Sequence, residues 1–227
     1  MKLPFLFAFS ACAWAQINRP SIGKMLDANG AVRTVYGIAA SVTLGDAEIT
    51  GVLSSGCSKT FCLAKTDDSL VSASGNVDAP KGRALFAFDG NTAFVWFVES
   101  RQLAQWQNGG LTAIDSTVDG EVLSIRANGG AVEFAVRRKS GVWIVKLDGS
   151  VAASLPASGP VMLIDGGAVY ATHDEIVIRD MRIPLEHVTA FSRMSPGYLE
   201  VRAGGVDYAL RTENGRETLF QLPGVVQ

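Results

Sequence analysis

Short apolar runs separated by Asp-Gly and Asn-Gly dipeptides recur along this sequence, and they restrict its possible folds more than any other feature. Asp-Gly pairs occur at 89–90, 119–120, 148–149 and 165–166, and Asn-Gly pairs at 128–129 and 214–215. These dipeptides tolerate the positive φ angles of the tight turns that join antiparallel strands. No helical periodicity extends over ten or more residues. The sequence therefore predicts an all-β protein built from consecutive hairpins.

The strands are expected where β-branched and aromatic residues cluster between these turns. The predicted strands are 32–38, 42–45, 48–53, 60–65, 69–73, 83–88, 92–98, 102–106, 111–115, 121–127, 131–137, 142–147, 150–155, 160–165, 168–172, 175–179, 188–193, 197–203, 206–212 and 217–222. The polar residues 16–31 are interpreted as an N-terminal segment that leads into a single β-propeller-like domain, 32–227.

The hairpins repeat about every 40 residues, which is the size of a four-stranded propeller blade. The repeats are 83–107, 121–149, 160–185 and 188–224, with 32–74 as the most divergent copy. This spacing predicts a small β-propeller of about five blades. We expect 32–38 to pair with the C-terminal strands and close the ring, since closure removes exposed sheet edges. Because the repeat is imperfect, a β-sandwich or a pair of stacked meanders is the alternative fold.

The strand-turn repeat over residues 32–224 resembles the secreted bacterial β-propeller families of the quinoprotein, NHL and WD40-like kinds. The likeness concerns the period and the placement of turns. The sequence has neither the Gly-His and Trp-Asp pair of WD40 repeats nor an evenly repeated tryptophan of the quinoprotein type. The resemblance implies a ring that presents loops for binding, and it implies no specific activity.

The first residues have the pattern of a signal peptide. A basic start precedes the apolar run 3–11, and small residues then predict cleavage after Ala15, with Gln16 as the new N-terminus. A lipid anchor on Cys12 is the alternative, but Phe9 stands where such sites usually have an aliphatic residue. No later apolar run is long enough to span a bilayer. We therefore expect a secreted or periplasmic protein whose mature chain has no membrane span.

Removal of residues 1–15 would leave two cysteines, Cys57 and Cys62. In an oxidising compartment they are predicted to form a structural disulfide across a short hairpin loop. The alternatives are a redox pair or a metal site. A redox pair normally has the C-x-x-C spacing, and a zinc site needs further Cys or His ligands, which are missing nearby.

Composition excludes some partners. The net charge is −2, and charges of both signs are interspersed, so no nucleic-acid-binding surface is expected. The basic cluster 137–139 is interpreted as a solvated hairpin turn before Gly141. The aspartates of the Asp-Gly turns lack the spacing that gathers several oxygens around one calcium ion. A monomer without a cofactor is expected.

Catalytic signatures are weak. No nucleophile elbow or phosphate-binding loop occurs, and the chain has only two histidines. His173 and His187 each lie beside carboxylates, so a metal site is conceivable, but both are expected in solvated turns. A glycosidase needs only two facing carboxylates, and no pair stands out among the 22 acidic residues. We therefore predict no metal ligands and no catalytic residues.

Trp106 is the strongest candidate for a ligand-contacting aromatic residue, because polar residues flank it. It either stacks on a sugar or a peptide proline, or it packs between blades. The function predicted from the sequence is that of a non-catalytic, exported binding or scaffolding domain whose ligand is a protein, a peptide or a glycan. A secreted hydrolase of the glycosidase kind, with carboxylates on loops, is the alternative.

Overall fold

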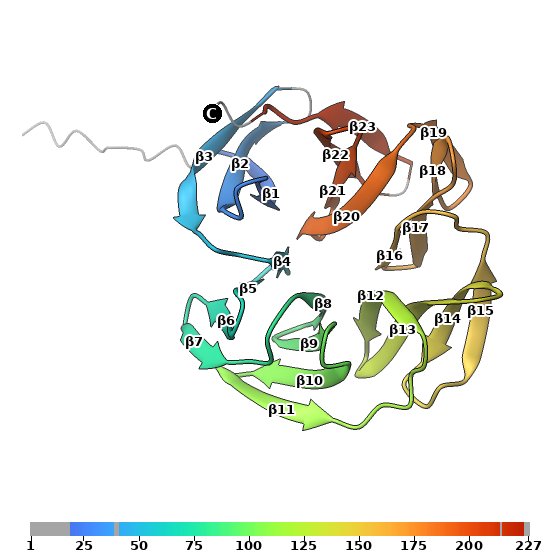
Figure 1. Ribbon diagram of the computed structural model, residues 1–227. Helices are drawn as coiled ribbons and strands as arrows, with labels where there is room; N and C mark the ends of the chain where they lie inside the picture. The colour runs from blue at the N-terminus through green and yellow to red at the C-terminus, as the bar shows by residue number, and fades with distance from the viewer. Residues whose placement is uncertain (1–18, 39–40, 214, 225–227) are drawn as a thin grey trace, which may run out of the picture.

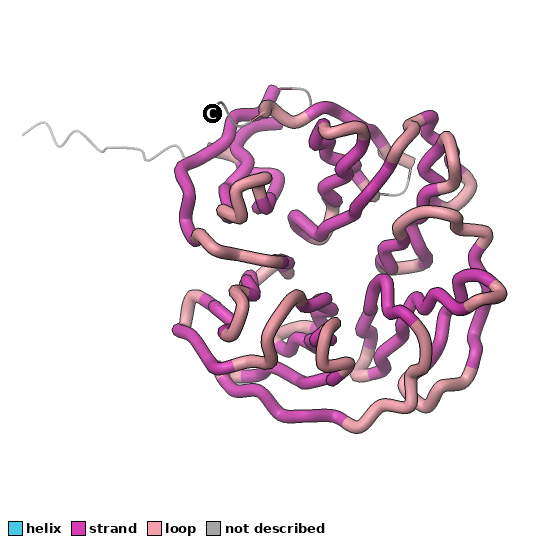
Figure 2. The backbone as a smooth tube through the Cα atoms, in the orientation of Figure 1, coloured by secondary structure: helices cyan, strands magenta, loops and turns pink. Residues whose placement is uncertain are grey.

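The computed structural model describes residues 19–38, 41–213 and 215–224 of the chain. In these residues 23 β-strands form six separate sheets. Within each sheet the strands are consecutive in the chain, and neighbouring strands pair antiparallel. The sheets stand side by side around a ring, with loops joining one sheet to the next (Figures 1 and 2). The protein is thus a six-bladed β-propeller. The predicted propeller class is confirmed, and the predicted number of blades, five, is wrong by one.

We number the blades in chain order. Blade 1 contains β1 (Ser21–Leu26), β2 (Val32–Ile38) and β3 (Ser41–Ile49), and blade 2 contains β4 (Ser54–Cys57), β5 (Cys62–Lys65), β6 (Ser69–Ser72) and β7 (Gly75–Asp78). Blade 3 contains β8 (Ala84–Asp89), β9 (Thr92–Phe97), β10 (Gln102–Gln107) and β11 (Gly110–Ile114). Blade 4 contains β12 (Glu121–Asn128), β13 (Ala131–Arg138), β14 (Gly141–Lys146) and β15 (Val151–Leu155). Blade 5 contains β16 (Val161–Ile164), β17 (Gly167–Ala171), β18 (Glu175–Ile178) and β19 (Met181–Pro184). Blade 6 contains β20 (Val188–Ser195), β21 (Tyr198–Ala203), β22 (Val206–Arg211) and β23 (Thr218–Gln221).

One blade too few was predicted because several strands in blades 1, 2 and 5 carry weak strand signals. The segment 32–74, interpreted as one divergent repeat, holds parts of two blades. The strands β1, β4, β7 and β19 were not predicted. β4 and β7 are short and polar, β1 contains a glycine, and β19 ends in a proline, which sheets tolerate at an outer edge. The segment 16–31, expected to lead into the domain, thus contributes β1 to blade 1.

Blade 1 has three strands in the described part of the chain, and none of them takes the innermost position. The carbonyl of Ile22 accepts a hydrogen bond from Ser195 Oγ at 2.7 Å, near the end of β20, whereas Leu26 contacts Glu200 and Arg202 on β21. β1 therefore runs in the same direction as β21, the second strand of blade 6, and opposite to β20, the first. This direction places β1 in the second position of its own blade. Figure 1 shows β4 and β20 nearer the centre of the ring than β1.

The expected pairing of 32–38 with the C-terminal strands is wrong, because β2 pairs with β1 and β3. Side chains of blade 6 instead bind the free edge of β1. Glu200 Oε2 accepts a hydrogen bond from the Leu26 N–H at 3.4 Å, and Arg202 Nη2 donates to the Leu26 carbonyl at 3.2 Å. Ser195 and these two side chains satisfy backbone groups that an inner strand would otherwise bond. Within residues 19–38, 41–213 and 215–224, blades 6 and 1 share no strand.

Close backbone contact also joins these two blades. Gly23 has φ +139°, and a Cβ at this position would lie 2.5 Å from the carbonyl oxygen of Met194. Met194 and Leu222 of blade 6 are buried in one cluster with Ile22 and Val35 of blade 1. The junction is therefore packed as tightly as a domain core.

The remaining core lies between adjacent blades. The run Phe94–Phe97 of β9 is buried at every position, as expected for a strand covered on both faces. Trp96 of blade 3 meets Phe134 of blade 4 edge to face, with ring centroids 5.6 Å apart. Burial between neighbouring sheets holds the ring together and leaves the turns at its two faces exposed.

Candidate binding site

The predicted disulfide is present. Cys57 and Cys62 are directly opposed in the β4–β5 pair and are bonded, with Cα atoms 4.1 Å apart. The loop between them is held by Ser58, whose hydroxyl accepts the N–H groups of Thr60 and Phe61 at 3.1 Å. The disulfide therefore fixes the hairpin that carries Phe61.

Trp106 packs between blades and does not line an open surface. Its side chain lies in the core between blades 2 and 3, and its residue exposure is 7%. Phe61 from the disulfide hairpin lies against it, with ring centroids 4.9 Å apart, and Phe61 meets Phe88 edge to face at 5.3 Å. The structure thus decides between the two interpretations in favour of packing, and the disulfide holds one member of this aromatic cluster in place.

The two histidines are exposed, His173 in the β17–β18 turn and His187 in the link between blades 5 and 6. His187 Nε2 is 3.8 Å from Glu186 Oε2, and both side chains are more than two-thirds exposed. His173 is also exposed. Over residues 19–38, 41–213 and 215–224, no three Cys, His, Asp or Glu side chains come together in a way that could hold a metal ion.

In the same residues no helix is long and apolar enough to cross a membrane. The predicted cleavage site, Ala15 and Gln16, and the alternative anchor Cys12 lie outside the described residues.

The antiparallel order of each blade gives the ring two distinct faces. One, the hairpin face, carries the turns between the first and second and between the third and fourth strands of each four-stranded blade. The other, the connection face, carries the turns between the second and third strands and the links from blade to blade. Each face of the described structure has one hollow of interest.

The hollow on the connection face lies on blade 4 and has a volume of about 530 Å³. We call it the basic hollow. It is lined by Asp119, Gly120, Arg137, Arg138, Lys139 and Ser140. Its residues come from the β13–β14 turn and from the link between blades 3 and 4. The pair Asp119-Gly120, expected in a hairpin turn, therefore connects two blades.

Local contacts hold the walls of the basic hollow in place. A Cβ on Gly120 would lie 2.6 Å from Val136 Cγ1, so only glycine allows this close approach. Arg138 Nε donates to the Asp119 carbonyl at 3.2 Å, and Arg137 Nη2 donates to the Gly159 carbonyl at 2.9 Å. Lys139 is exposed, and within the described part of the chain it has no ion-pair partner. The basic hollow therefore presents three cationic side chains and one carboxylate, and one of the cations, Arg137, is paired with Glu121 at 3.4 Å.

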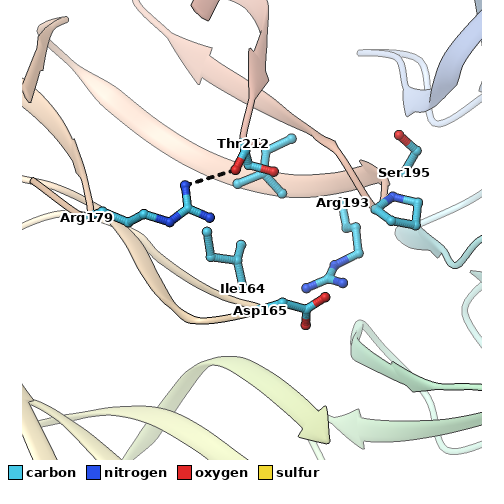
Figure 3. A pocket seen from close by; sticks show the side chains of 8 residues that line it. Ile164, Asp165, Arg179, Arg193, Ser195 and Thr212 are labelled. Atoms are coloured by element: carbon cyan, nitrogen blue, oxygen red, sulfur yellow. Dashed lines mark hydrogen bonds between the residues drawn. The ribbon is translucent and has the colours of Figure 1, made fainter. Parts of the chain in front are cut away.

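The hollow on the hairpin face is a cavity of about 60 Å³ between blades 5 and 6, here called the arginine cavity. Its lining is Ile164, Asp165, Arg179, Arg193, Ser195, Pro196, Leu199 and Thr212. Figure 3 shows the guanidinium groups of Arg179 and Arg193 entering from opposite sides, with Arg193 directed toward Asp165. Asp165 and Pro196 are exposed, so the cavity opens on this face.

Arg193 is incompletely paired at this cavity. Its Nη2 donates to the Leu163 carbonyl at 3.1 Å, but its buried Nε has no hydrogen-bond partner among the described residues. Burial lowers the pKa of Arg193, and the charge of Asp165 opposes this effect only in part. An unmet buried donor costs about 1–3 kcal/mol. The Nε–H of Arg193 is thus a buried donor that could bind an acceptor on a ligand.

Arg179 is held in place from blade 6. Its Nη1 donates to the Thr212 carbonyl at 3.0 Å and to Glu217 Oε1 at 2.8 Å. The residue has φ +52°, a left-handed backbone conformation that is uncommon for residues other than glycine. Arg126 of blade 4 supports the same cavity, because its Nη1 donates to the carbonyls of Ile164 and Gly167 at 2.7 and 3.0 Å.

Sequence reasoning missed the arginine cavity, because Asp165, Arg179 and Arg193 belong to three separate hairpins. The basic run 137–139 was noticed but interpreted as solvent-exposed only. A second missed feature is the fully buried Lys65, whose Nζ donates to the carbonyls of Thr66 and Asp67 at 2.7 and 2.8 Å. Burial lowers the pKa of Lys65. Its contacts tie the β5–β6 turn.

No protein-family model matches the sequence, and a search of curated proteins found no related sequence. Comparison with solved structures did find similar folds. A chain of the crystal structure of a nidogen/laminin complex has a TM-score of 0.56 at 12% sequence identity, and the match covers 89% of this chain and 92% of that chain. A protein of unknown function from Bacteroides caccae has a TM-score of 0.52 at 13% identity, and the match covers 88% and 94%. At such identities the similarity extends to the fold alone.

Proposed function

We propose that the protein is an exported, non-catalytic binding domain that takes an acidic peptide segment of a partner in the basic hollow. The observation that carries this proposal is the basic hollow itself. The hollow is shallow and open, with a volume of about 530 Å³, so an extended peptide segment would lie across its surface. Arginine side chains recognise carboxylates with paired donors, and Lys139 adds an unpaired charge.

Export is supported by the disulfide between Cys57 and Cys62. Disulfides persist in oxidising compartments and are rare in the cytosol. The predicted signal peptide over residues 1–15 agrees with such a location. A secreted or periplasmic binding role therefore fits both the chemistry of the cysteines and the chemistry of the basic hollow.

The test measures binding of a hexaglutamate peptide by isothermal titration calorimetry. The double variant Arg138→Gln, Lys139→Gln is expected to lose at least about tenfold in affinity, which corresponds to about 1.4 kcal/mol. Lys59→Gln is the matched control, because Lys59 is also an exposed lysine at a hairpin tip, on the opposite face. It should bind as the unchanged protein does.

Two outcomes would overturn the proposal. Equal binding by the double variant and the control would place the peptide elsewhere. Binding of an oligogalacturonate in preference to the peptide, followed by its cleavage, would favour the hydrolase alternative with loop carboxylates.

A further inference from the structure

The arginine cavity is independent of the basic hollow, since it lies between blades 5 and 6 and opens on the opposite face. It contains a buried donor, the Nε–H of Arg193, that the contacts between the two blades leave without an acceptor among the described residues. Most buried side-chain polar atoms have at least one hydrogen-bond partner. The Nε of Arg33 in blade 1 is an example, because it donates to Asp27 Oδ2 at 2.7 Å, and Nη1 of the same side chain donates to the Gly45 carbonyl at 3.1 Å. Arg193 departs from this pattern at its buried Nε.

We propose that the arginine cavity binds a carboxylate group, with Arg193 as the main donor and Arg179 as the second cation. A carboxylate offers two acceptor oxygens in the plane of a guanidinium, so it can accept from Nε and from a terminal nitrogen together. A cavity of about 60 Å³ has room for a few water molecules, and a carboxylate group is of that size.

The ligand is the end of a chain or a side chain, not a large molecule. The cavity opens between the exposed residues Asp165 and Pro196, and the turns on either side leave the rest of a ligand outside. Peptides with a free C-terminal carboxylate, or with an acidic side chain at a loop tip, have this shape. The cavity therefore fits a small anionic group that is carried on a longer peptide.

Asp165 governs the affinity of the cavity. It is the one carboxylate in the lining, and its charge partly balances that of Arg193. The second cation, Arg179, is already paired with Glu217. Because Asp165 shares this lining, its charge repels an entering carboxylate. Removal of the Asp165 charge is therefore expected to strengthen binding, whereas damage to Arg193 weakens it.

The test follows the Nε–H signal of Arg193 by nuclear magnetic resonance while a ligand is added to the folded protein. The probes are acetate, inorganic phosphate, and tetra-alanine with either a free or an amidated C-terminus. Acetate and the free peptide are expected to shift this signal in a saturable way, with dissociation constants on the order of 1 mM. The amidated peptide is expected to leave it unchanged.

Three variants make the result specific to the site. Arg193→Lys keeps the charge but loses the Nε–H fork, and should bind the free peptide at least about tenfold more weakly, a change of about 1.4 kcal/mol. Asp165→Asn should bind it more tightly. Arg33→Lys is the matched control, because the Nε of Arg33 already has a partner, and it should bind normally.

Asp165→Asn also keeps the test decisive if Arg193→Lys unfolds, since the Asp165 side chain is exposed and has no hydrogen-bond or ion-pair partner among the described residues. The absence of a saturable shift with acetate and the free peptide would overturn the proposal, as would equal binding of the amidated peptide. A response to phosphate alone would overturn the assignment to carboxylates. None of these outcomes depends on hexaglutamate binding at the basic hollow.

Discussion

Replacing Glu200 by glutamine is expected to change how the free energy of unfolding depends on pH. The Glu200 carboxyl is buried at the junction of blades 6 and 1, with 3% of the residue exposed. It accepts from the Leu26 N–H and lies 3.1 Å from Arg202 Nη2. Arg202 is also paired with Asp207 at 2.8 Å, so it keeps a counter-ion in the variant. Glutamine has nearly the same shape but no titrating proton.

Burial raises the pKa of Glu200 to about 7 from the ordinary value of 4.5, and the charge of Arg202 offsets this only in part. The folded protein therefore holds a proton that the unfolded chain releases near pH 4.5. Stability from this group is fully present below pH 4.5 and is lost as the pH rises through about 7. At about 1.4 kcal/mol per pH unit, the loss between about pH 5 and about pH 8 is roughly 2.5 kcal/mol.

The assay is urea unfolding followed by tryptophan fluorescence, at several values between about pH 5 and about pH 8, for both proteins. Relative to the glutamine variant, the unchanged protein should lose about 2.5 kcal/mol of unfolding free energy across this range. The difference between the two proteins isolates Glu200, because all other titrating groups are common to both. A difference that stays constant with pH would refute the reasoning, since it would mean that Glu200 titrates alike in the folded and unfolded states.

Three further predictions concern the hairpin, the ring junction and export. Replacing Cys57 and Cys62 by alanine should lower the free energy of unfolding by about 2 kcal/mol, because the disulfide closes a short loop. The measurement is urea unfolding, and equal stability in the presence and absence of reductant would contradict this prediction. Gly23→Ala should destabilise the protein by at least about 2 kcal/mol, seen as a lower melting temperature, because the new Cβ would collide with the Met194 carbonyl. An unchanged melting temperature would show that the junction adjusts freely. N-terminal sequencing of the exported protein should find cleavage after Ala15, and an uncleaved chain would rule it out.

Much of the strand pattern could be predicted from local sequence. The runs from 83 to 155 and from 188 to 222 match the strands of blades 3, 4 and 6, because their turn dipeptides and β-branched residues agree. The short polar strands β4 and β7 could not be recognised, since they become strands only through pairing with β5 and β6. Propensity is a weak guide where neighbouring strands supply the stabilisation.

The candidate sites were predicted less well. The basic cluster 137–139 is visible in the sequence, but the hollow that it lines depends on the close approach of Gly120 to Val136. The arginine cavity needs three hairpins to meet. Arg179, for example, bonds to Thr212, which is 33 positions away along the chain. Because the repeat is imperfect, its period does not indicate which residues so far apart in the chain lie close together in the fold.

The amino-acid sequence by itself determined the all-β character, the hairpin turns and the bond between Cys57 and Cys62. Each of these follows from interactions among residues a few positions apart, where turn geometry and strand alternation act directly. Only the tertiary structure decided that there are six blades, how the ring closes and where the cavities lie. Closure rests on contacts such as that between Leu26 and Glu200, 174 positions apart, and burial of one side chain against another blade leaves no local pattern in the sequence.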